Sequence, residues 1–117
     1  MLSVQMSELA ASLKAETERW LKKERAGQHP DPVKLKGFIF AIEETAQQLG
    51  RAYPEDKNFA DTLETSAKEI LDFLSNLAGK SVYSPEGGAI VSSIEKSSLT
   101  LVENLQNHTR TLHTHAH

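Results

Sequence analysis

Apolar residues recur along this chain at intervals of three, four and seven, the spacing that places side chains on one face of an α-helix. Proline or glycine interrupts the pattern at Gly27–Pro32, at Tyr53-Pro54 and between Gly79 and Gly88. Because proline lacks a backbone N–H and restricts the residue before it, each interruption separates two helices. The sequence therefore predicts four amphipathic helices, over residues 3–25, 32–52, 57–78 and 85–112.

Several residues at and between these interruptions have a predicted role in the helices. Asp31 is placed to accept a hydrogen bond from a first-turn amide of the second helix. Gly79 is placed as a left-handed cap at the end of the third helix. Gly37, inside the second helix, is interpreted as a point of close approach to a neighbouring helix. The pair Gly87-Gly88 is expected to delay the regular part of the fourth helix by a turn.

Four helices that each have one apolar face, joined by short connections, can share one core. Isolated helices of this length are only marginally stable in water, so the fold must depend on burying the apolar faces against one another. With 117 residues, only 6 Gly and only 4 Pro, the chain has the length of one domain and a poor composition for a turn-rich β fold. We predict a single all-α, four-helix bundle-like domain over residues 1–117, with antiparallel neighbours and a frayed His-containing tail over 108–117.

Composition excludes several kinds of chemistry. Cys is absent, so a disulfide, a thiol nucleophile or a thiolate metal site is impossible. The 13 Lys and Arg are outnumbered by 16 Asp and Glu, for a formal net charge of -3, which gives no support to a nucleic-acid-binding surface. No nucleophile elbow, phosphate-binding Gly-rich loop or His-Glu-x-x-His sequence is present. We predict no catalytic site and no cofactor.

Histidines and carboxylates are the other candidate functional groups of this chain. His113 and His117 are four residues apart and could share a helical face, but no carboxylate is placed to complete a metal site, so a solvated tail is favoured. The same tail contains His108 and His115. Carboxylates occur together at Glu43-Glu44, at Glu55-Asp56 and at Asp61 with Glu64. Their polar neighbours favour a solvated or helix-capping role over acid–base catalysis.

Basic residues gather where the first two helices meet. This basic corner consists of Lys22, Lys23, Arg25, Lys34 and Lys36. It is interpreted either as a solvated surface or as a docking patch for an acidic partner or a phosphate surface. Trp20, the only Trp, lies beside the corner in sequence and is either a core residue or an exposed interface anchor.

Two segments carry a resemblance to a known family. They are residues 58–65 (NFADTLET) running into 70–74 (ILDFL), and residues 90–105 (IVSSIEKSSLTLVENL). Their order and spacing resemble the helical subdomain A of the GAIN domain of adhesion G-protein-coupled receptors, over about residues 16–107. The family's self-cleaving tripeptide belongs to the β-rich subdomain that follows, so the resemblance implies no autoproteolysis here. Asn107-His108-Thr109 forms a glycosylation sequon, which suits an extracellular receptor.

The resemblance implies a non-enzymatic structural or ligand-engaging segment of a receptor's extracellular region, with a protein partner. The alternative is an intracellular, cytoplasmic adaptor or regulatory bundle that binds a protein through the basic corner Lys22–Lys36. No apolar stretch approaches the roughly 18 residues of a membrane span. We therefore expect no direct membrane insertion by this segment under either hypothesis.

Overall fold

The computed structural model describes residues 2–28 and 30–115, with side chains described over 4–28 and 30–108. It contains α1 (Leu2–Arg25), α2 (Val33–Ala52), the short 3₁₀ helix η1 (Pro54–Asp56), α3 (Lys57–Leu77) and α4 (Pro85–His115). These described residues include no strand, so the predicted all-α class is confirmed. The first three helices end within one residue of their predicted bounds.

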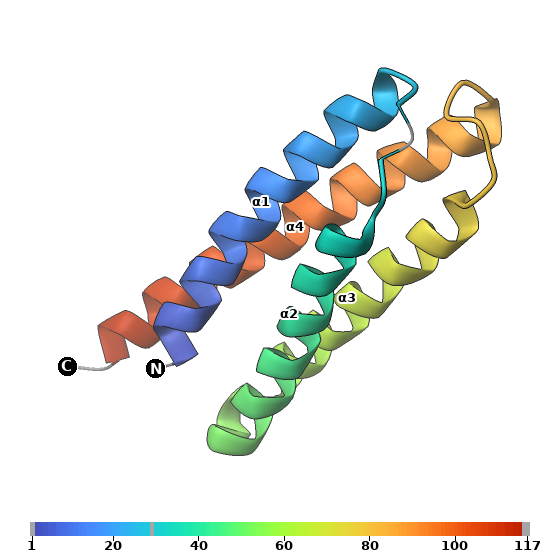
Figure 1. Ribbon diagram of the computed structural model, residues 1–117. Helices are drawn as coiled ribbons and strands as arrows, with labels where there is room; N and C mark the ends of the chain where they lie inside the picture. The colour runs from blue at the N-terminus through green and yellow to red at the C-terminus, as the bar shows by residue number, and fades with distance from the viewer. Residues whose placement is uncertain (1, 29, 116–117) are drawn as a thin grey trace.

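The helices run alternately up and down, with short connections between them (Figure 1). In Figure 1, α1 lies along α4 and α2 lies along α3. Each helix contacts two neighbours, in the cyclic order α1, α2, α3, α4, and no described residues of a diagonal pair have Cα atoms within 8 Å. The resulting bundle is elongated, measuring 49 × 21 × 19 Å.

The core is a continuous cluster to which all four helices contribute one buried face. Helices α2 and α3 follow the predicted spacing most regularly, because their buried residues recur every three or four positions. The buried apolar residues are Met6, Ala10, Leu13, Trp20 and Leu21 of α1; Leu35, Ile39, Ile42, Ala46 and Leu49 of α2; Ala60, Leu63, Ala67, Ile70, Leu74 and Leu77 of α3; and Val91, Ile94, Leu101, Val102 and Leu105 of α4.

Two helix ends use glycine in the left-handed region, where a side chain would be strained. Gly27 has φ +77°, and the N–H groups of Gly27 and Gln28 donate to the carbonyls of Glu24 and Lys23, which closes α1 in a Schellman motif. Gly79 has φ +78° just after α3, as predicted. Its neighbour Lys80 donates to the carbonyl of Leu77, so Gly79 turns the chain away from the helix.

Two other glycines differ from their predicted roles. A Cβ on Gly37 would meet nothing within 4 Å, so the predicted close approach there is wrong; Gly50 makes one instead, against the Ala60 side chain of α3. Gly87 does not delay α4, which is regular from Pro85. A Cβ on Gly87 would overlap the carbonyl oxygen of Ser81, so glycine allows the preceding loop to pack on the first turn of α4.

Helix α4 also extends to His115, past its predicted end at residue 112. His108, predicted to begin a frayed tail, lies inside this helix. Its ring stacks on Phe59 of α3 with the ring centroids 3.9 Å apart and the planes inclined by 17°. Packing against α3 therefore holds His108, which its polar surroundings in the sequence placed in a frayed tail.

Candidate functional site

The basic corner lies where α1 ends and α2 begins. Lys22 and Lys23 are in the last turn of α1, where the negative end of the helix dipole favours cations. Lys34 and Lys36 are in the first two turns of α2, close to the positive end of that helix. A cation is unfavourable at the N-terminal end of a helix, so Lys34 and Lys36 do not stabilise α2 through the helix dipole.

Arg25 has a different role from the lysines beside it. Its guanidinium donates two hydrogen bonds of 3.0 Å to the carboxylate of Glu95 on α4, in a bidentate pair. This contact raises the pKa of Arg25 and lowers the pKa of Glu95. Arg25 therefore links α1 to α4 and is engaged within the bundle, although the sequence groups it with the basic corner.

The lysines of the corner differ from Arg25 in this respect. Among the described residues, no carboxylate forms an ion pair with Lys22, Lys23, Lys34 or Lys36. Lys22 and Lys34 are exposed, whereas Lys23 and Lys36 are half-buried. The structure thus places Lys22 and Lys23 at the end of α1 and Lys34 and Lys36 at the start of α2, in a chain whose net charge is -3.

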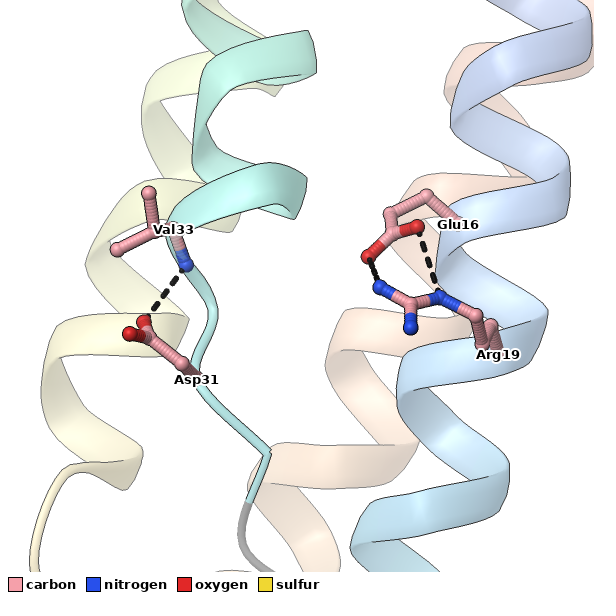
Figure 2. Close-up of polar contacts among 4 residues, drawn as sticks. All are labelled: Glu16, Arg19, Asp31 and Val33. Carbon is pink, nitrogen blue, oxygen red and sulfur yellow. Dashed lines mark hydrogen bonds and ion pairs between the residues drawn. The ribbon is translucent and has the colours of Figure 1, made fainter.

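A buried carboxylate that the sequence analysis missed lies beside this corner. Glu16 is 5% exposed and accepts hydrogen bonds of 3.1 and 2.6 Å from Arg19 (Figure 2). The hydrogen bond from Arg19 is the main cause that lowers the pKa of Glu16; burial opposes it, and the charges of Lys34 and Lys23 add to the lowering. The Glu-x-x-Arg spacing, which places both side chains on one helix face, is the sequence feature that indicates this ion pair.

The connection into α2 is held as the sequence predicts. The carboxylate of Asp31 accepts a 3.0 Å hydrogen bond from the backbone N–H of Val33 (Figure 2). Pro32 lies just before the helix, and its carbonyl accepts the hydrogen bond from the N–H of Lys36. This connection runs along the bundle, so α2 begins well below the end of α1 (Figure 1). A surface between α1 and the end of α3 is thereby left uncovered by α2.

An open groove of about 740 Å³ occupies this position. Trp20 lies at its base and is only 3% exposed, which agrees with the core interpretation and not with an exposed anchor. Its indole Nε1 has no hydrogen-bond partner among the described residues. The other apolar lining residues are Pro30, Pro32, Leu74, Leu77 and Ala78, and the charged ones are Glu24, Lys36 and Lys80.

A smaller hollow of about 330 Å³ lies next to the groove and shares Trp20 and Pro30 with it. Its lining includes the Glu16–Arg19 pair, together with Lys23 and Asp31. The basic corner and the groove are therefore adjacent, and Lys36 belongs to both. The sequence did not reveal the groove because three separate segments form it.

Near the opposite end of the bundle, His108 forms a second polar contact. Its side chain is 11% exposed, and its Nε2 lies 3.7 Å from a carboxylate oxygen of Asp56 in η1. Burial lowers the pKa of His108, and the charge of Asp56 raises it in part. In the part of the chain that is described, no three His, Asp or Glu side chains are placed to hold a metal ion.

The remaining candidates are solvent-facing or lie outside the description. Glu64 accepts a 3.0 Å hydrogen bond from Lys68, which lowers its pKa. Asn107 is exposed on α4. The side chains of His113, His115 and Thr109, and all of His117, lie outside the described residues, so the predictions that concern them stay predictions.

Comparison with family models, curated proteins and solved structures gives no match for this chain. The GAIN resemblance thus stays a prediction. Within residues 2–28 and 30–115, no helix combines the length and hydropathy that crossing a bilayer requires. Any functional conclusion therefore depends on the basic corner, the groove and the residues around them.

Proposed function

We propose that this chain is a non-enzymatic helical module that binds an acidic protein partner through Lys22, Lys23, Lys34 and Lys36. The observation that supports this proposal best is the placement of Lys34 and Lys36. Both lie near the positive end of α2 and neither has a carboxylate partner among the described residues. Their position is unfavourable for a cation. The charge of Glu16 offsets part of this cost at Lys34, and a partner's carboxylates would offset the rest.

The surroundings of the corner support the same proposal. Arg25 is held by Glu95, so Lys22 and Lys23 lie on a fixed helix end and not on a free tail. The bundle has excess negative charge overall, so the local excess of positive charge is not a consequence of composition. Such a patch accelerates association with an acidic surface and makes it sensitive to salt.

Charge reversal with a matched control tests the proposal. The triple variant Lys22→Glu, Lys23→Glu, Lys36→Glu reverses the charge of three of the four corner lysines. A control triple variant changes Lys14, Lys57 and Lys96, which are exposed on other surfaces, to Glu. Both variants carry the same formal charge, so a general charge effect would alter both equally.

We expect the wild type and the control variant to capture the same acidic protein from a lysate of the source cells, and the corner variant to lose it. Circular dichroism should show the same helix content for all three chains, and salt should weaken the capture. Equal capture by the corner variant would contradict the proposal.

The receptor hypothesis is the second candidate function. In it, the bundle is a rigid extracellular subdomain that supports a following subdomain and engages ligands. Its support is the resemblance of residues 58–74 and 90–105, together with the exposed Asn107 in a sequon. Secretion of the chain from animal cells should then yield a glycan on Asn107, detected by mass spectrometry and absent from an Asn107→Gln variant. An unmodified Asn107 would favour the cytoplasmic adaptor.

A further inference from the structure

The groove at Trp20 has the size and lining of a site for a small molecule. Its volume of about 740 Å³ lies within the range of roughly 300 to 1,000 Å³ that is usual for ligand sites. Trp20, Pro30, Pro32, Leu74 and Leu77 give it a mainly apolar wall. Such a wall is suited to a flat or compact apolar body and gains free energy when water is displaced from it.

The charges at the groove favour one kind of ligand. Lys36 lines the groove and has no carboxylate partner among the described residues. Lys80 also lines it, but its Nζ donates to the carbonyl of Asn76 at 2.6 Å and lies 3.7 Å from Glu86. Glu24, the one carboxylate in the lining, is only 4% exposed, so the cation of Lys36 dominates the accessible rim.

Trp20, which lines the groove, also carries an unpaired polar atom among the described residues. The Nε1 of Trp20 is buried and has no acceptor among the described residues, and buried N–H groups are normally paired. We propose that the groove binds a small organic anion, a carboxylate or sulfonate carried by an apolar body. The test needs only the purified chain and no protein partner, so its outcome does not depend on the proposed function.

The probe for this test is 8-anilinonaphthalene-1-sulfonate, an aromatic sulfonate. Because Trp20 is the only Trp, light absorbed by Trp20 can be transferred only to a probe bound nearby. We expect saturable binding of one probe per chain, with loss of Trp20 emission and a matching gain in probe emission. N-phenyl-1-naphthylamine has the same apolar body without the sulfonate, and we expect it to bind about tenfold more weakly.

Two variants locate the probe. Ala78→Phe fills the groove from an exposed position and should abolish the energy transfer. Lys36→Glu should weaken binding of the sulfonate by about tenfold and leave binding of the neutral amine unchanged. Lys96→Glu, on an exposed face of α4, is the matched control and should bind both probes like the wild type. Circular dichroism melting identifies any variant that is not folded.

Three results would overturn the inference. The first is the lack of saturable energy transfer in the folded wild type. The second is equal affinity for the sulfonate and the neutral amine, which would remove the preference for an anion. The third is binding that both Ala78→Phe and Lys36→Glu leave unchanged, because the probe would then lie elsewhere on the bundle.

Discussion

The contact between α1 and α4 contains two buried hydroxyl groups that lack partners. Thr17 is 3% exposed and Ser98 is fully buried. Neither Thr17 Oγ1 nor Ser98 Oγ has a hydrogen-bond partner among the described residues, and both side chains line the same hollow of about 140 Å³. We expect the substitution Thr17→Val to stabilise the protein, although it removes a polar group from a native structure.

The magnitude follows from what the substitution changes. Valine has nearly the shape of threonine, so packing is retained and the unpaired hydroxyl is replaced by a methyl group. Leaving a buried hydroxyl unpaired costs about 1 to 3 kcal/mol. We therefore expect Thr17→Val to raise the free energy of unfolding by about 1 to 2 kcal/mol, and the melting temperature by about 4 °C or more. Ser98→Ala should stabilise the protein by a similar amount.

Urea unfolding, followed by circular dichroism, measures both effects. The exposed positions Thr100 and Ser92 of α4 serve as controls, because Thr100→Val and Ser92→Ala change helix propensity without changing a buried group. Thr17 and Ser98 line the same hollow, so the double variant measures how strongly the two substitutions are coupled. If both single variants lower the free energy of unfolding, and the double variant lowers it by much less than the sum of the two, the hydroxyls share a partner. That result would refute the reasoning.

Three further effects follow from single positions. Gly37→Ala should stabilise the protein by about 0.5 to 1 kcal/mol in urea unfolding, because the added Cβ meets nothing and alanine favours the helix; a loss of stability would contradict this. Gly87→Ala should destabilise it by more than about 2 kcal/mol, because the Cβ overlaps the carbonyl of Ser81; a neutral result would show that the loop is not packed there. Burial lowers the pKa of His108 below 6.5, so the unfolded chain binds a proton more readily. Stability should therefore fall as the pH drops from 6.5 towards the lower pKa of the folded state, and His108→Phe should remove that part of the pH dependence.

The sequence predicted those features of the fold that depend on local spacing. The apolar residues of α2 and α3 recur so regularly that both the helices and their buried faces were evident. The left-handed conformation of Gly79 was predictable because a turn must follow the helix there. In each case the physical cause lies within a few residues of the effect.

The predictions that were wrong depended on how segments pack in three dimensions. The spacing of apolar residues does not show that the space beside Gly37 is open, or that the carbonyl of Ser81 packs against Gly87. His108 is polar and near the end of the chain, yet Phe59 and Asp56 approach it from another helix end. Arg25 was assigned to the basic corner because its partner Glu95 is 70 residues away.

The candidate site, too, could be predicted only as far as local sequence determines it. Local composition identified the four lysines, but their lack of carboxylate partners became evident only in the structure. The groove is formed by α1, the connection at Pro30 and Pro32, and the end of α3. Its existence depends on where α2 begins relative to α1, which the spacing of apolar residues does not determine.

The central claim is that an acidic partner meets this bundle at Lys22, Lys23, Lys34 and Lys36. A carbodiimide couples a lysine amine directly to a carboxylate with which it is in contact, so it records such pairs without a spacer. After treatment of the chain in a lysate of the source cells, peptide mass spectrometry identifies which lysines have become joined to another protein. The account predicts that these bonds concentrate on the four corner lysines and disappear at high salt. Bonds spread evenly over all lysines, or concentrated on Lys14, Lys57 and Lys96, would contradict it.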